Sequence, residues 1–220
     1  MISGLSRELI AVRVAKEFKD GYFVNLGIGL PTLASSFIPP GVDIILHSEN
    51  GVMGYGRIAN DDEINPDLVN AGSQPVTLNP GASFFDSAES FAMIRGGHVD
   101  MVVLGAFQVS EKGDLANWMT SDRKTGSIGG SMDLVKAAGK VIIAMEHTDK
   151  TGKPRIVKEC TYPLTGARVV DLIITNLAVI EVNAEGLLLK EVAPGVTPEQ
   201  VQAATGPKLK LARNLKEMAL

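Results

Sequence analysis

Residues 140–145 read Lys-Val-Ile-Ile-Ala-Met, and residues 100–104 read Asp-Met-Val-Val-Leu. Both runs are short and rich in Val and Ile, and neither alternates apolar with polar residues as a half-buried strand does. Continuous apolar runs of this length are typical of strands that are buried on both faces of a parallel sheet. The two runs therefore indicate an α/β fold, with a layered sheet flanked by helices.

Strand and helix patterns alternate on both sides of these two runs. Further strands are expected at residues 22–26, 43–47, 172–175, 178–182 and 187–192. Helices are expected at residues 5–18 and 87–95, and after Pro31, Met132 and Thr197. The polar stretch over residues 55–67 is expected to form a loop.

Several of these helices carry signals at their ends. Lys19 followed by Asp20-Gly21 is a typical helix stop, and Pro31 suits the first turn of a helix because its missing N–H would be unpaired there. Residues 86–89 (Asp-Ser-Ala-Glu) and 197–200 (Thr-Pro-Glu-Gln) both have the pattern of an N-terminal cap. These signals support the alternation of strands with helices.

The composition is that of an ordinary globular protein. The chain has 220 residues, of which 45% are hydrophobic and 21% charged, and no repeat or linker divides it, so residues 1–220 are expected to form one domain. A net charge of −4 argues against a nucleic-acid partner. We find no signal peptide and no apolar run that could span a membrane, and the one cysteine, Cys160, is expected to be a half-buried side chain. A cytoplasmic location is therefore predicted.

Functional groups in such folds lie in loops that follow the carboxyl ends of strands. Residues 25–29, 48–51 and 126–131 meet this description. Asn50-Gly51 is by itself a common turn dipeptide, so a purely structural turn competes with a functional one. The position of Glu49 directly after an apolar strand favours function, because burial and backbone N–H groups there can control the ionisation of its carboxylate.

The other glycine-rich segments and the histidines are less specific. Gly27-Ile28-Gly29 lacks the third glycine of a dinucleotide fingerprint, so close backbone approach, to another element or to a ligand, is the better interpretation. Residues 126–131 precede a helix and either offer free N–H groups to an anion or form a flexible surface connection. The three histidines are widely scattered, and no metal site is predicted.

Taken together, a series of phrases resembles the beta subunit of class I 3-oxoacid coenzyme A transferases. The resemblance runs in order from about residue 7 to residue 206, and residues 48–51 (SENG) are the family's signature. The other phrases are residues 25–32 (NLGIGLPT), 83–98 (SFFDSAESFAMIRGGH), 113–118 (GDLANW), 129–134 (GGSMDL), 145–148 (MEHT) and 160–165 (CTYPLT).

The resemblance implies a fold and a partner. The fold is the NagB/RpiA/CoA-transferase-like class, which these enzymes share with sugar-phosphate isomerases of the ribose-5-phosphate type. The partner is an alpha subunit of similar size, with active sites where alpha meets beta, typically as α2β2. The ligands implied are an acyl-CoA and a carboxylic acid. Coenzyme A acts as a substrate and as part of a covalent intermediate, and no tightly bound cofactor, metal, nucleic acid or membrane is implied.

The resemblance also assigns roles to residues. Glu49 is the expected nucleophile, and the backbone N–H of Gly130 is the expected donor to the oxyanion. Asn25 is expected to hold the Glu49 carboxylate, and Asn117 to contact the CoA arm. Gly129, Ser131 and Met132 are expected to line the thioester end of CoA. The remaining residues expected to bind substrate or CoA are Gly27, Gly29, Ser48, Asn50 and Gly51.

The sequence departs from the family pattern at three places, and it leaves several functions open. Residues 119–125 replace a common proline-glycine-lysine phrase, Ser131 replaces a usual alanine, and Ser73 stands where animal-type relatives often carry lysine. These departures concern the acyl preference and the CoA contacts. Acetoacetate with succinyl-CoA or acetyl-CoA is the leading substrate pair, followed by 3-oxoadipate and short fatty acids. An acyl-CoA hydrolase or an isomerase of the same fold, or a non-catalytic domain, are the competing classes.

Overall fold

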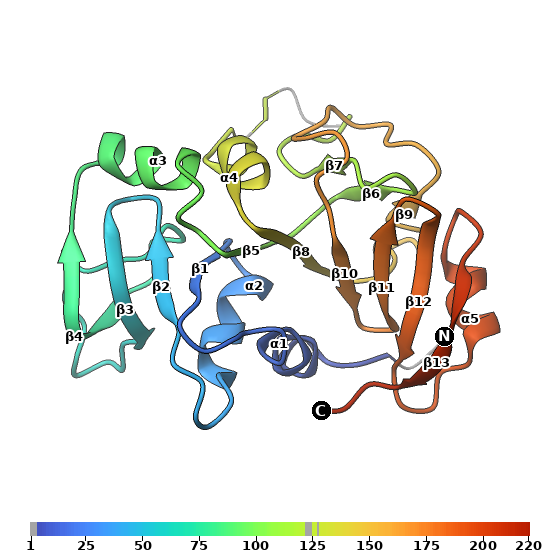
Figure 1. Ribbon diagram of the computed structural model, residues 1–220, viewed down its shortest axis with the longest axis horizontal. Helices are drawn as coiled ribbons and strands as arrows, with labels where there is room; N and C mark the ends of the chain where they lie inside the picture. The colour runs from blue at the N-terminus through green and yellow to red at the C-terminus, as the bar shows by residue number, and fades with distance from the viewer. Residues whose placement is uncertain (1–3, 122–124, 127) are drawn as a thin grey trace.

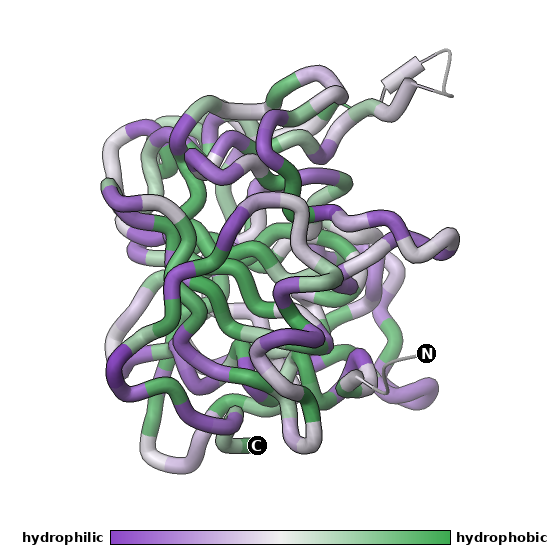
Figure 2. The backbone as a smooth tube through the Cα atoms, turned by 90° about the vertical axis from the view of Figure 1, so that its right-hand side faces the viewer, coloured by the Kyte–Doolittle hydropathy of each residue, from purple (hydrophilic) through white to green (hydrophobic). Residues whose placement is uncertain are grey.

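The computed structural model describes residues 4–121, 125–126 and 128–220. Its main element is a ten-stranded sheet with the strand order β13-β12-β11-β10-β8-β5-β1-β2-β3-β4. Figure 1 shows this sheet running across the molecule, with α1 and α2 below the central strands in that view and α3 and α4 above them. Apolar segments gather in the interior and hydrophilic segments at the periphery (Figure 2). The predicted α/β fold, a sheet flanked by helices, is confirmed.

The two apolar runs form the centre of the sheet. Strand β5 (Met101–Leu104) pairs in parallel with β8 (Lys140–Met145), so that Val102 lies opposite Val141. All residues of β5 are buried, as are all residues of β8 except Lys140. Burial on both faces explains why these runs lack alternation, and the prediction of two parallel, fully buried strands is confirmed.

Three further strands extend the parallel part of the sheet. Strand β1 (Phe23–Leu26) lies between β5 and β2 (Ile45–Ser48), and β10 (Leu172–Thr175) lies on the other side of β8. All of these pairings are parallel, so the carboxyl ends of β1, β2, β5 and β8 meet at one edge of the sheet. This edge carries the loops that the sequence singled out.

Antiparallel strands complete both ends of the sheet. On one side are β3 (Val52–Ile58) and β4 (Val76–Phe84), and on the other are β11 (Ala178–Asn183), β12 (Gly186–Val192) and β13 (Lys210–Glu217), of which β13 runs parallel to β12. The loop predicted from residue 55 is wrong over its first residues, because Tyr55 is 2% exposed and pairs with Leu78 of β4. Gly54 and Gly56 interrupt the apolar pattern and hid this strand.

The helices begin close to the predicted positions. Helix α1 (Arg7–Ala15) has Ser6 as its N-cap and ends at Ala15 rather than Phe18. Helix α2 (Leu30–Leu33) has proline in its first turn and leads into the 3-10 helix η1 (Ala34–Phe37). Helices α3 (Ser87–Arg95) and α5 (Pro198–Ala204) are capped by Asp86 and Thr197 as predicted, and α4 (Ser131–Ala137) follows the glycine-rich segment.

A small second sheet, which the sequence did not predict, lies beside the main one. It contains β6 (Gln108–Ser110), β7 (Leu115–Ala116) and β9 (Ile156–Val157), in the order β7-β6-β9. Cys160 is half-buried near it, as expected, and its thiol contacts the carbonyl oxygen of Asp114 at 3.6 Å. One domain over residues 1–220 stays a prediction. Among the described residues, no helix has both the length and the apolar character needed to cross a membrane.

Candidate active site

The carboxyl ends of β1 and β2 bring Asn25 and Glu49 together. The strands are parallel, with Asn25 opposite His47, so Glu49 emerges just beyond the end of β2 and beside β1. The Asn25 side-chain amide donates from Nδ2 to Oε2 of Glu49 at 3.1 Å. Asn25 is 1% exposed, whereas Glu49 is only half-buried. Within the described part of the chain, Oε1 of Glu49 accepts no hydrogen bond, so one carboxylate oxygen is held and the other is available.

The turn that carries Glu49 is fixed by its neighbours. The Gly51 N–H donates to the Ser48 carbonyl oxygen at 3.0 Å, and Gly51 has φ of 112°, which a residue with a side chain rarely adopts. Ser48 Oγ accepts from the Ala71 N–H at 2.8 Å, and Asn50 Nδ2 donates to the Val69 carbonyl oxygen at 2.8 Å. Ser48, Asn50 and Gly51 therefore hold the turn against residues 69–71, and none of them lines the cavity that Glu49 faces.

Buried polar groups surround the turn on the side of the sheet. His47 is 1% exposed, and its ring stacks on Phe85 with the ring centroids 6.0 Å apart. Burial lowers the pKa of His47, against the opposing influence of the Glu49 carboxylate. Burial and the charge of Glu49 both raise the pKa of Tyr55. Both side chains are therefore uncharged at neutral pH, and Glu49 is the charged group of this cluster.

The glycine-rich segment approaches Glu49 from the opposite side. Gly130 is the N-cap residue of α4, and a Cβ atom built on it would lie 3.4 Å from Cγ of Glu49. Within the described part of the chain, the Gly130 N–H has no hydrogen-bond acceptor. A free backbone N–H beside a carboxylate is the arrangement that an oxyanion donor requires.

Helix α3 links the two sides of the site. It lies next to α4 in Figure 1, and Arg95 on α3 donates to Asp133 on α4 at 2.8 Å. On the same helix, Ser90 contacts His47, and the ring of Phe91 lies against Gly130. A single helix therefore positions the Glu49 turn relative to the glycine-rich segment.

A cavity of about 360 Å³ opens between these groups. Of the residues predicted for the site, those that line it are Asn25, Gly27, Glu49, Asn117, Gly129, Gly130 and Ser131. A Cβ atom on Gly129 would meet nothing within 4 Å, because this residue faces open space. Met132, the second residue of α4, is half-buried and does not line the cavity. Ser127 of the glycine-rich segment and residues 122–124 of the departure from the family pattern lie outside the described residues.

Three predicted residues have clear structural roles. The Gly27 N–H donates to the Val103 carbonyl oxygen at 2.8 Å, and a Cβ atom on Gly27 would lie 3.1 Å from that oxygen. Gly29, with φ of 89°, is the N-cap of α2 and does not line the cavity with Glu49. The amide of Asn117 already donates to the Gly105 carbonyl oxygen at 3.2 Å and accepts from Thr165 at 2.6 Å. These bonds fix the orientation of the Asn117 amide and leave one of its two N–H hydrogens for a ligand.

The sequence did not point to Arg155, which also lines the cavity. It precedes β9 in a polar stretch without a recognisable motif, and β9 itself was not predicted. Its guanidinium donates to the Ala106 carbonyl oxygen at 3.3 Å. Among the described residues, no carboxylate forms an ion pair with Arg155. Of the described residues that line the cavity, Arg155 is therefore a cationic side chain without an ion-pair partner.

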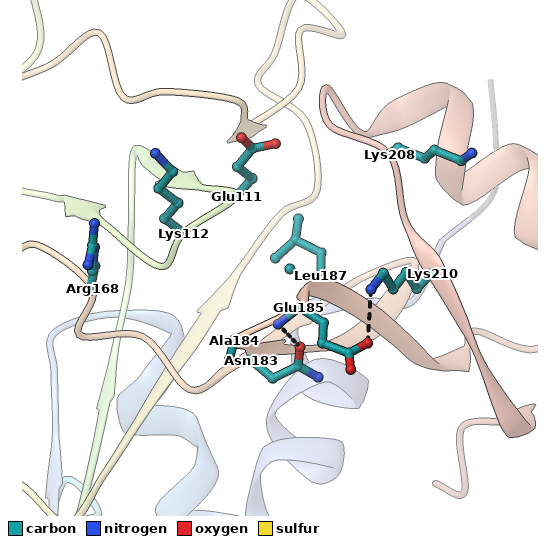
Figure 3. A pocket seen from close by; sticks show the side chains of 10 residues that line it. Glu111, Lys112, Arg168, Asn183, Ala184, Glu185, Leu187, Lys208 and Lys210 are labelled. Carbon is teal, nitrogen blue, oxygen red and sulfur yellow. Dashed lines mark hydrogen bonds and ion pairs between the residues drawn. The ribbon is translucent and has the colours of Figure 1, made fainter.

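A larger cavity lies elsewhere, at the turn between β11 and β12, and has a volume of about 770 Å³ (Figure 3). Its charged lining residues are Glu111, Lys112, Arg168, Glu185, Lys208 and Lys210. Glu185 pairs with Lys210 at 2.9 Å. This cavity contains none of the predicted site residues, so its size alone does not make it the candidate active site. In the described ranges, no group of three or more His, Cys, Asp or Glu residues could hold a metal ion.

Comparison with known sequences gives one consistent result. The family model for coenzyme A transferase matches residues 7–204. The succinyl-CoA:3-ketoacid coenzyme A transferase 2A of Rattus norvegicus, mitochondrial, is 51% identical over 96% of this chain, which spans only 41% of that relative. The B subunit of the Helicobacter pylori succinyl-CoA:3-ketoacid coenzyme A transferase is 50% identical over 90% of this chain and 96% of its own length. The B subunit of the Acinetobacter baylyi 3-oxoadipate CoA-transferase is 48% identical over 93% of this chain and 95% of its own length.

Comparison with solved structures gives the same fold at lower identity. An acyl-CoA transferase of Escherichia coli O157:H7 superimposes with a TM-score of 0.76 and 22% identity, over all of this chain and 44% of the other. The decarboxylase AibA/AibB superimposes with a TM-score of 0.69 and 20% identity, over 98% of this chain and 89% of the other. At this identity the likeness concerns the fold alone. The two solved proteins share the fold, although one is named a transferase and the other a decarboxylase.

Proposed function

The chain belongs to the coenzyme A transferase family, and we propose that it is the catalytic beta subunit of an enzyme that moves CoA from succinyl-CoA or acetyl-CoA to a 3-oxo acid such as acetoacetate. The single observation that carries this proposal is the position of Glu49. Its carboxylate is held by Asn25 through one oxygen, has no described hydrogen-bond donor on the other, and faces a cavity beside Gly130. Relatives about 50% identical along most of their own length, whose names specify succinyl-CoA and a 3-ketoacid, support the substrate pair.

In this proposal Glu49 is a covalent nucleophile. The carboxylate attacks the thioester carbonyl of the donor, which yields a mixed anhydride and free CoA thiolate. The thiolate attacks the glutamyl carbonyl, which releases the donor acid and leaves a glutamyl-CoA thioester. The acceptor carboxylate then attacks this thioester, and the steps run in reverse until Glu49 is free again. Dividing one exchange into several easier covalent steps lowers the barrier and conserves the thioester energy.

Each step develops an oxyanion that needs an aimed donor. The N–H of Gly130, which has no acceptor among the described residues, is the donor on this chain, and loss of one such donor typically costs about 100- to 1000-fold in rate. Asn25 keeps the carboxylate oriented, and Gly129 leaves space for the thioester end of CoA. The guanidinium of Arg155, which forms no ion pair with a described carboxylate, suits the negative charge that every proposed substrate carries.

The proposal includes a partner. The bacterial relatives are named as B subunits, which supports an alpha subunit that completes the site. An α2β2 assembly and a cytoplasmic location stay predictions. The second candidate function is transfer of CoA to 3-oxoadipate, which the Acinetobacter baylyi relative favours. Short fatty acids as acceptors, and hydrolysis with water as acceptor, remain competing outcomes of the test.

The test is the intact mass of the two-subunit enzyme after acetoacetyl-CoA and borohydride. Borohydride reduces a glutamyl thioester to an alcohol, so the mass of this chain should change in the wild type and not in Glu49→Ala. Glu199→Ala, which removes an exposed carboxylate on α5, is the matched control and should behave like the wild type. An enzyme that exchanges CoA without the mass change would rule out the role of Glu49. Release of free CoA without an acceptor acid would identify a hydrolase.

A further inference from the structure

We propose that His47 is a positioning residue that holds Asn25 in the orientation needed by Glu49, and that Ser90 sets the tautomer in which His47 does so. The inference rests on the proposed function, because it concerns the same carboxylate. The four side chains form one chain of hydrogen bonds, from Ser90 on α3 through His47 on β2 and Asn25 on β1 to Glu49. None of the comparisons assigns a role to His47 or Ser90.

The distances determine which atoms carry the protons. The Asn25 amide nitrogen, Nδ2, lies 3.1 Å from Oε2 of Glu49 and 3.2 Å from Nδ1 of His47. An amide nitrogen has two hydrogens and accepts none, so Nδ1 of His47 must present its lone pair. The proton of a neutral imidazole is then on Nε2, which lies 3.2 Å from the hydroxyl oxygen of Ser90 and donates to it. Both hydrogens of the Asn25 amide are thus in use.

Burial and charge both favour this arrangement. Asn25, His47 and Ser90 are 1%, 1% and 0% exposed, so water does not compete for their hydrogen bonds. The groups that contact His47 are Asn25 on β1, Ser90 on α3 and Phe85 in the connection between β4 and α3, and none of them is charged. Tyr55, on the neighbouring strand β3, is neutral because burial raises its pKa. Glu49 is the charged group that acts on His47, and burial outweighs it, so His47 stays neutral near pH 7.

The amide of Asn25 has a reason to rotate, and His47 opposes it. Its carbonyl oxygen, Oδ1, is buried and accepts no hydrogen bond within the described part of the chain. An unpaired buried acceptor is unfavourable, so the held orientation needs compensation from the other end of the amide. Rotation would bring Oδ1 next to two acceptors, the Glu49 carboxylate and Nδ1 of His47. Two acceptors, the Glu49 carboxylate and Nδ1 of His47, keep the NH2 group of Asn25 turned toward Glu49. A substitution that removes the Nδ1 lone pair removes one of these two acceptors.

Substitutions of His47 separate positioning from packing. Glutamine offers an acceptor and a donor on one neutral amide, so His47→Gln can serve both Asn25 and Ser90. Leucine has similar bulk and neither function, so His47→Leu leaves one Asn25 N–H unpaired. In the two-subunit enzyme we expect His47→Leu to lower kcat roughly tenfold while KM changes less than about twofold, because the nucleophile is misaligned and substrate binding is not touched. His47→Gln should recover most of the loss.

The control and the pH profile test the same point. His98→Leu removes an exposed histidine at the end of α3 and should leave kcat unchanged. As the pH falls, protonation of His47 puts a hydrogen on Nδ1, which then faces an N–H of Asn25. Two donors cannot form a hydrogen bond, so Asn25 loses this partner and kcat falls. The acid limb of kcat that results should be present in the wild type and absent from His47→Gln. If His47→Gln loses as much activity as His47→Leu, or if both retain wild-type kcat, the positioning role is overturned.

A spectroscopic measurement keeps the inference separate from the proposed function. The ring nitrogens of 15N-histidine report the tautomer directly in the full chain, without any assay of activity. We expect His47 as the Nε2–H tautomer in the wild type, and partial conversion to the Nδ1–H tautomer in Ser90→Ala, because Nε2–H then lacks its acceptor. An Nδ1–H tautomer in the wild type would overturn the inference even if CoA transfer is found. If His47 shows the expected Nε2–H tautomer but Glu49 forms no covalent intermediate, the inference about His47 stands and the proposed function is refuted.

Discussion

A Cβ atom added to Gly130 would lie 3.4 Å from Cγ of Glu49 and 3.2 Å from Cζ of Phe91. Gly130 therefore lies close to both the candidate nucleophile and the Phe91 ring. Glu49 follows β2, Gly130 precedes α4 and Phe91 belongs to α3, so the contact joins three elements that are distant in the sequence. The site depends on a close approach at which a side chain on Gly130 would force the Phe91 ring to shift.

Gly130→Ala is expected to lower kcat by roughly tenfold with little loss of stability. The contact with Phe91 is tight, so the ring or the Gly130 backbone must move by a few tenths of an ångström, and misplacement of the oxyanion donor beside Glu49 is costly to rate. Steady-state kinetics and a thermal unfolding curve check this. Gly129→Ala is the matched control for stability, because its Cβ atom would meet nothing within 4 Å. A Gly130→Ala enzyme with wild-type kcat would contradict the expected contact.

Gly51→Ala is expected to destabilise the fold by about 3 kcal/mol. Gly51 has φ of 112°, and a Cβ atom there would collide with the Phe85 carbonyl oxygen. The Phe85 N–H also donates to the Gly51 carbonyl oxygen at 3.1 Å, so Phe85 cannot move away without losing a hydrogen bond. Chemical denaturation measures the free energy of unfolding, with Gly129→Ala again as control. Equal stability of the two variants would show that the turn relaxes more easily than its geometry indicates.

Arg155→Met is expected to raise KM for the acyl-CoA substrate roughly tenfold, because charge-assisted hydrogen bonds are worth about 1.5–3 kcal/mol. Arg155 lines the cavity with Glu49 and has no carboxylate partner in the described ranges. Arg155→Lys, which keeps the charge, should lose less. Arg57→Met is the control, since Arg57 is already paired with Glu63 at 2.7 Å on the exposed side of β3. An unchanged KM in Arg155→Met would show that the substrates do not reach this side chain.

His147 is expected to make stability fall in mild acid. Burial lowers its pKa to about 4, and its ring nitrogens each lie 2.8 Å from a threonine hydroxyl, of Thr175 and of Thr205. The unfolded chain takes up the proton first, so stability is lost as the pH falls from about 6.5 to about 4, by about 3 kcal/mol in total.

The measurement for His147 is the free energy of unfolding against pH in the wild type, His147→Gln and the exposed-site control His98→Gln. The slope between about pH 6.5 and about pH 4 should be shallower in His147→Gln only. His47, whose pKa burial also lowers, contributes to the remaining slope in all three proteins. Parallel curves for His147→Gln and the wild type would contradict the prediction.

Local signals predicted the elements whose pattern does not depend on distant partners. The helix over Ser87–Arg95 was found to the residue, because its cap is encoded next to it by Asp86 and Glu89. The apolar runs of β5 and β8 indicated strands buried on both faces because helices cover a parallel sheet on both sides. The strands that were missed, such as β4 and β13, are mostly exposed along their length, so no apolar pattern marks them. Their conformation depends on pairing with a neighbour.

The sequence alone determined the family, the α/β class and the candidate carboxylate, because SENG and the buried runs are contiguous signals that survive without any tertiary information. The resemblance already assigned Asn25 and Gly130 to that carboxylate, but only the tertiary structure decided how they are held there and which other residues join them. Asn25, His47, Ser90, Gly130 and Arg155 reach the site from separate elements. The parallel register of β1 with β2 and the seating of α3 bring them together, and both depend on packing between segments far apart in the chain.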